Sequence, residues 1–169
     1  INNSKNLIDN ITKYKNKVRF ISCSSSRIFK EKKGLVNENS NIFAKDFYSK
    51  FRIETNKYLI KTKKRYKNFD FTNVILFNHD SFFRSNRFLI PRIIFALISK
   101  DQKFLNEIIR ENIVMDYSHA EDICDALIKI LFFKKRINKI ILSSGKKTHI
   151  NDIIKYLIKN NKLDLNLNF

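Results

Sequence analysis

The sequence predicts an α/β fold in which parallel strands alternate with helices. Three short apolar segments have strand character, and helical patterns separate them. Strands that alternate with helices favour a parallel sheet with helices packed on it. Polar residues follow two of the strands, Ser24–Ser26 after the first and Asn78–Ser81 after the second. Ligands of parallel sheets bind beyond the carboxyl ends of the strands, so these residues mark a candidate site.

The predicted strands are short and rich in β-branched and aromatic residues. They are Val18–Cys23 (VRFISC), Phe71–Phe77 (FTNVILF) and Lys139–Ser144 (KIILSS). Each is bounded by polar residues, as buried strands usually are.

The predicted helices follow from apolar spacing and from capping residues. The first covers about Ser4–Lys15, and the second, Phe47–Tyr66, is rich in helix formers. A third covers Leu89–Ser99, where Pro91 is tolerated because first-turn N–H groups have no partner within the helix. In Ser118–Phe133, the pair Ser118 and Glu121 has the spacing of a capping box, and the last helix covers about Asn151–Ile158. The segment Glu31–Ser40 is predicted to be a polar loop.

The composition is that of a globular protein with an unusual excess of positive charge. Hydrophobic residues make up 43% of the 169 residues, which is enough to build a core. The net charge of +18 is compatible with nucleic acid or with an anionic small substrate. Because the lysines are spread along the whole chain and no nucleic-acid-binding motif is present, we expect no nucleic-acid partner.

Neither a membrane protein nor a metalloprotein is predicted. No apolar run approaches the roughly 20 residues of a membrane span, and no signal peptide is visible. The two cysteines, Cys23 and Cys124, lack metal-ligand spacing and suit a reducing cytoplasm, where we expect the protein to act.

Four segments together resemble the extended short-chain dehydrogenase/reductases that act on nucleotide sugars, and most closely GDP-mannose 4,6-dehydratase. They read ISCSSSRIF, FYSKFR, VILFNHDSFFRSNRFLIPRII and MDYSHAEDICDAL. Family members have Phe-Asn-His-Glu-Ser where this chain has Phe77–Ser81, and Asp-Trp-Gly-His-Ala where it has Asp116–Ala120. The resemblance covers about Ser4 to Ile158.

The resemblance implies part of a Rossmann-type NAD(P)-binding fold together with part of a small substrate domain. Residues of about 1–80 and 118–145 would form the Rossmann-type core, and about 81–117 and 146–169 the substrate-binding part. The glycine-rich loop that cradles the pyrophosphate of a dinucleotide is not found, since Gly34 and Gly145 are the only glycines. We therefore expect the 169 residues to be a single partial domain, a fragment of a longer chain that lacks the first half of the fold.

The resemblance also implies the catalytic residues. Tyr48 matches the tyrosine that takes the proton of the substrate hydroxyl, and Arg52 stands where the family has a lysine. Positions i and i+4 share one helix face, so both side chains would reach the cofactor and the substrate. Ser25 matches a serine or threonine that orients the reacting oxygen. The carboxylate that would remove the C5 proton is replaced by Arg27, and neither Glu31 nor Glu38 is an evident substitute.

Substrate recognition is implied for three residues. Asn78 matches an amide that contacts the nucleotide sugar, Arg84 matches an arginine of the same loop, and Arg92 stands where relatives have a lysine on the diphosphate. Arginine can bind phosphate through two N–H donors, so the last replacement is compatible with binding. Met115 replaces a further family arginine. The alternative for the arginines is a solvated basic face.

Three functions follow, in order of support. The first is an NAD- or NADP-dependent nucleotide-sugar dehydratase like GDP-mannose 4,6-dehydratase, acting as a homo-oligomer on polysaccharide precursors. The second is an epimerase or reductase of the same family, or a relative that has lost activity, because Arg27, Arg52 and Met115 depart from the family pattern. A basic RNA-binding domain is third.

Overall fold

The computed structural model describes residues 2–14, 16–30 and 34–169, which form two compact units. The first unit consists of the chain up to Phe77 together with Asp122–Leu142, and the second of Asn78–Glu121 together with Ser143–Phe169. Each unit is therefore built from two separate stretches of sequence. The assignment of a cofactor-binding and a substrate-binding part stays a prediction.

A parallel sheet in the order β1-β2-β6 forms the centre of the first unit. Its strands are β1 (Val18–Ser25), β2 (Phe69–Leu76) and β6 (Lys139–Leu142). Val18 lies opposite Phe69 and Ser25 opposite Leu76, so β1 and β2 end together. The parallel α/β fold and its three strands are confirmed, but each boundary differs from the prediction. β1 continues past Cys23 to Ser25, β2 is Phe69–Leu76 rather than Phe71–Phe77, and β6 ends at Leu142 rather than at Ser144.

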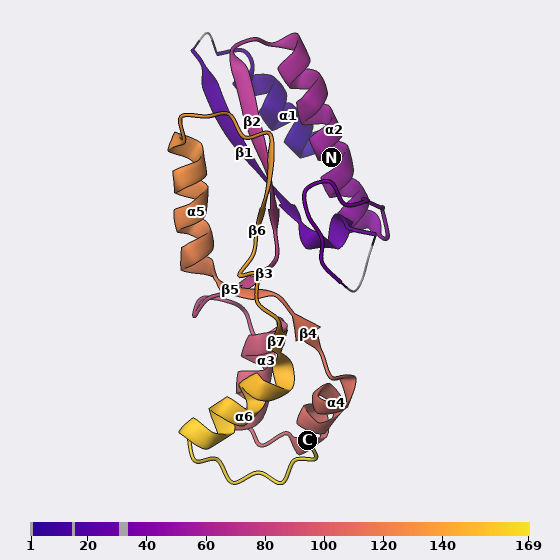
Figure 1. The fold of residues 1–169 in the computed structure, drawn as a ribbon, viewed down its shortest axis with the longest axis vertical. Helices are drawn as coiled ribbons and strands as arrows, with labels where there is room; N and C mark the ends of the chain where they lie inside the picture. Colours follow the sequence, from indigo (N-terminus) through magenta and orange to yellow (C-terminus); the bar gives the residue numbers. More distant parts are fainter. Residues whose placement is uncertain (1, 15, 31–33) are drawn as a thin grey trace. The chain divides into compact units, whose positions relative to one another are not determined.

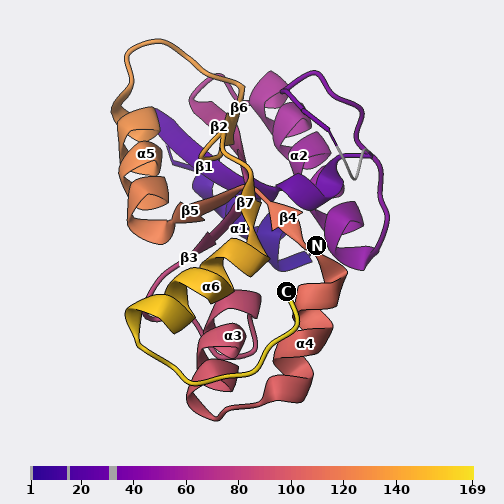
Figure 2. The same cartoon turned by 60° about the horizontal axis from the view of Figure 1, so that its bottom comes forward.

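Helices lie on both sides of this sheet, as Figures 1 and 2 show. On one side are α1 (Asn2–Ile11) and α2 (Phe47–Arg65), and on the other is α5 (Ala120–Phe132). Alternate strand residues make the core under α1 and α2, where Phe69 and Phe71 pack with Ile8 and Leu59. Arg19 donates from Nη1 to the carbonyl oxygen of Leu131 at 2.6 Å and so ties the end of α5 to β1.

Two helix starts differ from the prediction. The first helix begins at Asn2 and ends at Ile11, and Lys15, the predicted end, lies outside the described residues. The predicted capping box of Ser118 and Glu121 is wrong, because Ser118 pairs with His79 in a parallel ladder. The His119 ring nitrogen Nδ1 instead accepts from the Glu121 N–H at 3.3 Å, at the start of α5.

The second unit is mainly helical, with two small two-stranded sheets. β3 (Asn78–Asp80) pairs in parallel with β5 (Tyr117–His119), and β4 (Val114–Met115) pairs antiparallel with β7 (Thr148–His149). Its helices are α3 (Leu89–Ile98), α4 (Gln102–Glu111) and α6 (Ile150–Asn160), which lie together in Figure 2. They share a core of buried residues: Ile93, Ala96, Leu97, Leu105, Ile108, Ile109, Ile150 and Ile154.

α3 and α6 correspond to helices predicted from the sequence, whereas α4 was not predicted. Pro91 lies in the first turn of α3, as expected. In the described part of the chain, no helix combines the length and the apolar character needed to cross a membrane.

Candidate active site

The start of α2 fixes the position of Tyr48. Asp46 precedes the helix, and its carboxylate accepts from the Ser49 N–H at 2.7 Å while the Ser49 hydroxyl accepts from the Asp46 N–H at 3.0 Å. This reciprocal capping box satisfies two N–H groups that would otherwise lack partners at the helix start. Ser49 is fully buried, whereas Tyr48 next to it is 41% exposed. Local capping thus holds Tyr48 at the surface in the first helical turn.

Arg52 lies one helical turn after Tyr48 and contacts it directly. Its Nη2 donates to the Tyr48 hydroxyl oxygen at 3.2 Å, and its Nη1 donates to the Cys23 carbonyl oxygen at 2.8 Å. The guanidinium carbon lies 4.9 Å from the centre of the Tyr48 ring. Arg52 therefore joins the first turns of α2 to the end of β1 and places positive charge beside the phenol oxygen.

Ser25 and Arg27 complete this group. The Ser25 hydroxyl oxygen accepts from the Arg27 N–H at 3.3 Å, at the start of the short 3-10 helix η1 (Ser26–Ile28). The Arg27 guanidinium pairs with Asp46 and lies 5.9 Å from the centre of the Tyr48 ring. The structure thus brings Arg52 and Tyr48 together by direct contact, and it connects Ser25 to them through Arg27.

Two carboxylates of the first unit, Asp46 and Glu38, are already engaged in hydrogen bonds. Hydrogen bonds from the backbone and hydroxyl of Ser49, and then the Arg27 partner, lower the pKa of Asp46. Glu38 accepts from the Ile141 N–H at 3.0 Å, and that bond lowers the pKa of Glu38. Glu31 lies outside the described residues. Asp46 was missed by the sequence analysis, although an aspartate three residues before a serine, ahead of a helical pattern, was a legible capping signal.

In the second unit, Asn78 belongs to a junction of three chain segments. It is exposed at the start of β3, and its Nδ2 donates to the Asp116 carbonyl oxygen at 3.3 Å. The Asp116 carboxylate accepts from the N–H groups of Ser144 and Gly145, both at 2.8 Å. Asp116 thereby holds the turn that contains Gly145, whose φ of +71° suits glycine.

Arg84 and Arg92 are held by different neighbours. Arg84 lies 3.7 Å from the Asp80 carboxylate and stacks on the Phe88 ring at 3.6 Å. Arg92 is exposed on α3 and lies 4.4 Å from the centre of the Phe104 ring. No contact among the described residues joins Arg84, Arg92 and Asn78 to one another, so their shared role stays a prediction.

Tyr117 was not singled out by the sequence analysis. Its hydroxyl donates to the second oxygen of Asp80 at 2.7 Å. Burial, followed by this hydrogen bond, raises the pKa of Tyr117. Asp80 is therefore shared between Tyr117 and Arg84. Met115, where relatives have an arginine, packs against the core of this unit.

A groove of about 510 Å3 also lies in the second unit, between α3, β7 and α6. Its lining contains none of the predicted substrate-binding residues; it consists of Ile90, Ile94, Lys146, Lys147, Thr148, His149, Asp152, Ile153, Tyr156 and Leu157. The groove is therefore no part of the predicted site.

Solved structures with the same fold include nucleotide-sugar epimerases and a dehydratase. UDP-glucuronic acid 4-epimerase from Bacillus cereus, in complex with UDP-glucuronic acid and NAD, is 18% identical with a TM-score of 0.82, over 98% of this chain and 52% of that one. RMD from Pseudomonas aeruginosa, complexed with NADPH, is 14% identical with a TM-score of 0.85, over 99% and 59%. The dTDP-glucose 4,6-dehydratase from Bacillus anthracis, in complex with NAD, is 12% identical with a TM-score of 0.71, over 98% and 53%. The chain thus spans about half the length of these structures.

The sequence itself also matches a family model. A search of curated proteins gave no significant match. The model described as GDP-mannose 4,6 dehydratase matches residues 3–168, which is nearly the whole chain. The chain therefore belongs to the GDP-mannose 4,6-dehydratase family of nucleotide-sugar epimerases and dehydratases.

Proposed function

We propose that this chain serves an NAD(P)-dependent enzyme that dehydrates a nucleotide sugar, with GDP-mannose as its substrate. The observation that supports this proposal most is the bond from Arg52 to the Tyr48 oxygen at the carboxyl end of β1. The family match and the NAD- or NADPH-containing structures with the same fold support the cofactor. We further propose that the protein acts in the cytoplasm as a homo-oligomer.

In this proposal Tyr48, Arg52 and Ser25 transfer the proton of the reacting sugar hydroxyl, and three other residues bind the substrate. Tyr48, as the phenolate, takes the proton of the sugar hydroxyl and becomes a neutral phenol. The N–H of Arg52 stabilises the negative charge that the phenolate oxygen carries before this transfer. Ser25 donates a hydrogen bond to the reacting sugar oxygen and orients it. Asn78, Arg84 and Arg92 bind the diphosphate of the substrate.

The donor set around Tyr48 fits the nicotinamide end of a dinucleotide. Tyr48 and Arg52 offer an exposed phenol and a guanidinium, which suit hydroxyl groups of a ribose. NAD(P), when bound, supplies a ring that accepts and returns a hydride.

Epimerisation is the second candidate, and Arg27 favours it. Elimination of water needs a carboxylate that removes the C5 proton, whereas Arg27 occupies that position and pairs with Asp46. Removal and return of a hydride at one carbon, with NAD(P) as the hydride acceptor and donor, needs from the protein only the tyrosine and the hydroxyl that orients the substrate. The two reactions therefore share Tyr48 and differ in their demand for a carboxylate.

Replacing Tyr48 tests the shared step. We expect Tyr48→Phe to lower kcat by roughly 10^2- to 10^4-fold, because the ring remains while the proton acceptor is lost. The purified protein is incubated with GDP-mannose and NADP, and the product is identified by mass and by NMR. Tyr66→Phe, at the other end of α2, is the matched control.

The product decides between the candidates. A 4-keto-6-deoxy sugar nucleotide supports dehydration, and an epimer of unchanged mass supports epimerisation. Turnover that is equal in Tyr48→Phe and in the unmodified protein would contradict both.

A further inference from the structure

A second pocket, of about 280 Å3, lies in the first unit at the amino ends of β1 and β2. Ser25 ends β1, so this pocket lies at the opposite end of the strands from the candidate active site. Its volume is near the lower limit of small-molecule sites, which is about 300 Å3. Neither the proposed reaction nor the predicted substrate residues use it.

The lining of this pocket is strongly cationic. Five basic side chains contribute to it, namely Lys17, Arg19, Lys67, Lys134 and Arg136, against the single carboxylate of Asp70. A concave surface that carries one sign of charge concentrates ions of the opposite sign. The pocket therefore suits a small polyvalent anion.

Asp70, the one carboxylate among the described residues that line the pocket, forms its ion pairs with Lys63 and Arg136 and not with the lysines of the lining. Asp70 binds Lys63 at 2.5 Å and also lies 3.4 Å from Arg136. Burial raises the pKa of Asp70, but the bonds and charges of Lys63 and Arg136 outweigh it and lower the pKa overall. Asp70 thus remains ionised and occupied, which leaves Lys17, Lys67 and Lys134 to bind a ligand.

The walls of the pocket are fixed by bonds between distant parts of the chain. Arg19 donates to the carbonyl oxygens of Leu131, at 2.6 Å, and Lys135, at 3.5 Å. These bonds hold the turn after α5 against the strand. Val18 donates from its N–H to the Asn68 carbonyl oxygen at 2.8 Å and closes the floor between β1 and β2.

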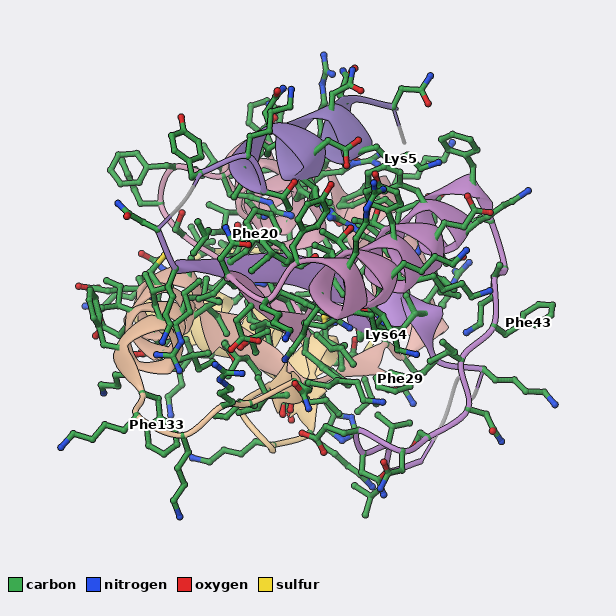
Figure 3. All side chains as sticks on the ribbon, turned by 90° about the horizontal axis from the view of Figure 1, so that it is seen from above. Lys5, Phe20, Phe29, Phe43, Lys64 and Phe133 are labelled. Carbon is green, nitrogen blue, oxygen red and sulfur yellow. The ribbon has the colours of Figure 1, made fainter. Side chains whose placement is uncertain are left out.

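Two phenylalanines at the end of α5 add an apolar surface to the same pocket. Phe132 and Phe133 both line it, and Phe133 is 48% exposed. Figure 3 views the unit from the amino ends of the strands and labels Phe133 at its margin. An aromatic face beside cations suits a base or another planar group carried by a phosphate.

We propose that this pocket binds a diphosphate group, either as the free anion or carried by a nucleoside, independently of the sugar-nucleotide site. Lys17, Lys67 and Lys134, which form no ion pair with an acid among the described residues, can each form a charge-assisted hydrogen bond to phosphate oxygens. Arg136 lines the same pocket and adds a further cation to it, although its Nε also lies 3.4 Å from Asp70.

Calorimetric titration of the purified protein with inorganic diphosphate tests this site. We expect one diphosphate per chain and, in Lys67→Ala/Lys134→Ala, a Kd that is at least about tenfold weaker. Lys57→Ala/Lys64→Ala removes the same two positive charges at exposed positions outside the pocket lining, and Figure 3 shows Lys64 well apart from Phe133; we expect the Kd of this variant to change by less than about twofold. Equal weakening in all variants, or no binding at low salt, would overturn the proposal.

A further variant separates this pocket from the proposed substrate site. Binding should persist in Asn78→Ala/Arg92→Ala, and its loss there would assign the anion to the substrate site instead. Circular dichroism checks the folding of each variant, and the single change Lys17→Ala replaces the double change if the latter fails to fold. Parallel titration with GDP distinguishes the two sources of the diphosphate. If GDP binds more tightly than inorganic diphosphate and Phe133→Ala removes the difference, the ligand is the nucleotide. If the two bind equally and Phe133→Ala leaves both Kd values unchanged, the ligand is the free anion.

Discussion

Arg52 is the residue whose structural and chemical roles are hardest to separate. Its planar guanidinium donates to Cys23 and to Tyr48 at once, which a single ammonium group does not reproduce in the same geometry. Its Nε is buried and has no hydrogen-bond partner among the described residues. The family lysine at this position would supply charge, whereas the arginine also anchors the helix to the strand.

Substitution of Arg52 separates these roles. We expect Arg52→Lys to keep kcat within about tenfold, because the charge beside Tyr48 remains, and Arg52→Gln to lower it by about a hundredfold or more. Both variants should lose about 1–2 kcal/mol of unfolding free energy with the bond to Cys23. Kinetics and urea unfolding of the same samples measure the two effects. A similar kcat in both variants would show that the charge is unimportant.

At the scale of single residues, the sequence predicted contacts within one helix better than contacts between elements. The spacing of Tyr48 and Arg52 placed them on one face, and their side chains do meet. The pairing of Arg27 with Asp46 joins two segments 19 residues apart, and no local pattern encodes it. The catalytic and binding roles of these residues stay predictions.

Among the structural elements, α2 depends on its first turn. Ser49 is fully buried, and its hydroxyl accepts a hydrogen bond from the Asp46 N–H and donates to Asp46 oxygens. Removal of the hydroxyl therefore leaves these Asp46 groups without that partner. We expect Ser49→Ala to lower the unfolding free energy by about 0.5–2 kcal/mol and to reduce kcat, because Tyr48 lies in the same turn. Lys50→Ala, exposed in that turn, is the control and should leave both nearly unchanged. Urea unfolding measures the difference, and equal stability of the two variants would contradict the capping role.

The pair of short strands β3 and β5 depends on a tyrosine that must stay protonated. Because the pKa of Tyr117 is raised in the folded protein, its contribution to stability is present below the ordinary tyrosine pKa of 10.0 and is lost as the pH rises through the higher folded value. We therefore expect the unfolding free energy to fall above about pH 10. Tyr117→Phe should cost about 1 kcal/mol at neutral pH and should show a smaller alkaline loss.

Urea unfolding of Tyr117→Phe and of the unmodified protein, at neutral and at alkaline pH, measures how the stability depends on Tyr117. Tyr58 provides the comparison, because its bond to Asp9 also raises its pKa and the alkaline loss from Tyr58 should persist in Tyr117→Phe. Identical pH profiles for Tyr117→Phe and the unmodified protein would show that Tyr117 does not cause the alkaline loss of stability.

Elements were predictable where they are long and periodic. The three strands of the main sheet and five of the helices follow from apolar spacing and composition. The strands β3, β4, β5 and β7 have two or three residues each, which is too short for any periodicity. α4 carried a readable signal, with Asp101 before it and Leu105, Ile108 and Ile109 on one face.

For the molecule as a whole, the net charge of +18 is the dominant electrostatic fact. Like charges in a compact chain repel one another, and dissolved salt screens that repulsion over about 10 Å at 0.1 M. We expect the thermal midpoint to rise between about 0.05 M and 0.5 M sodium chloride. Sucrose, which does not screen charge, is the control for general effects of the solution. A midpoint that falls with salt would show that attractive ion pairs outweigh the repulsion.

The division of each unit between two stretches of sequence has a consequence for synthesis. β6, the third strand of the main sheet, comes after the whole segment Asn78–Glu121. While the ribosome makes that segment, β2 already exists but one of its edges has no neighbour, and such an edge can pair with another nascent chain. The emergence of β6 ends this vulnerable interval, so chaperone demand should be greatest while the segment between β2 and β6 is being made.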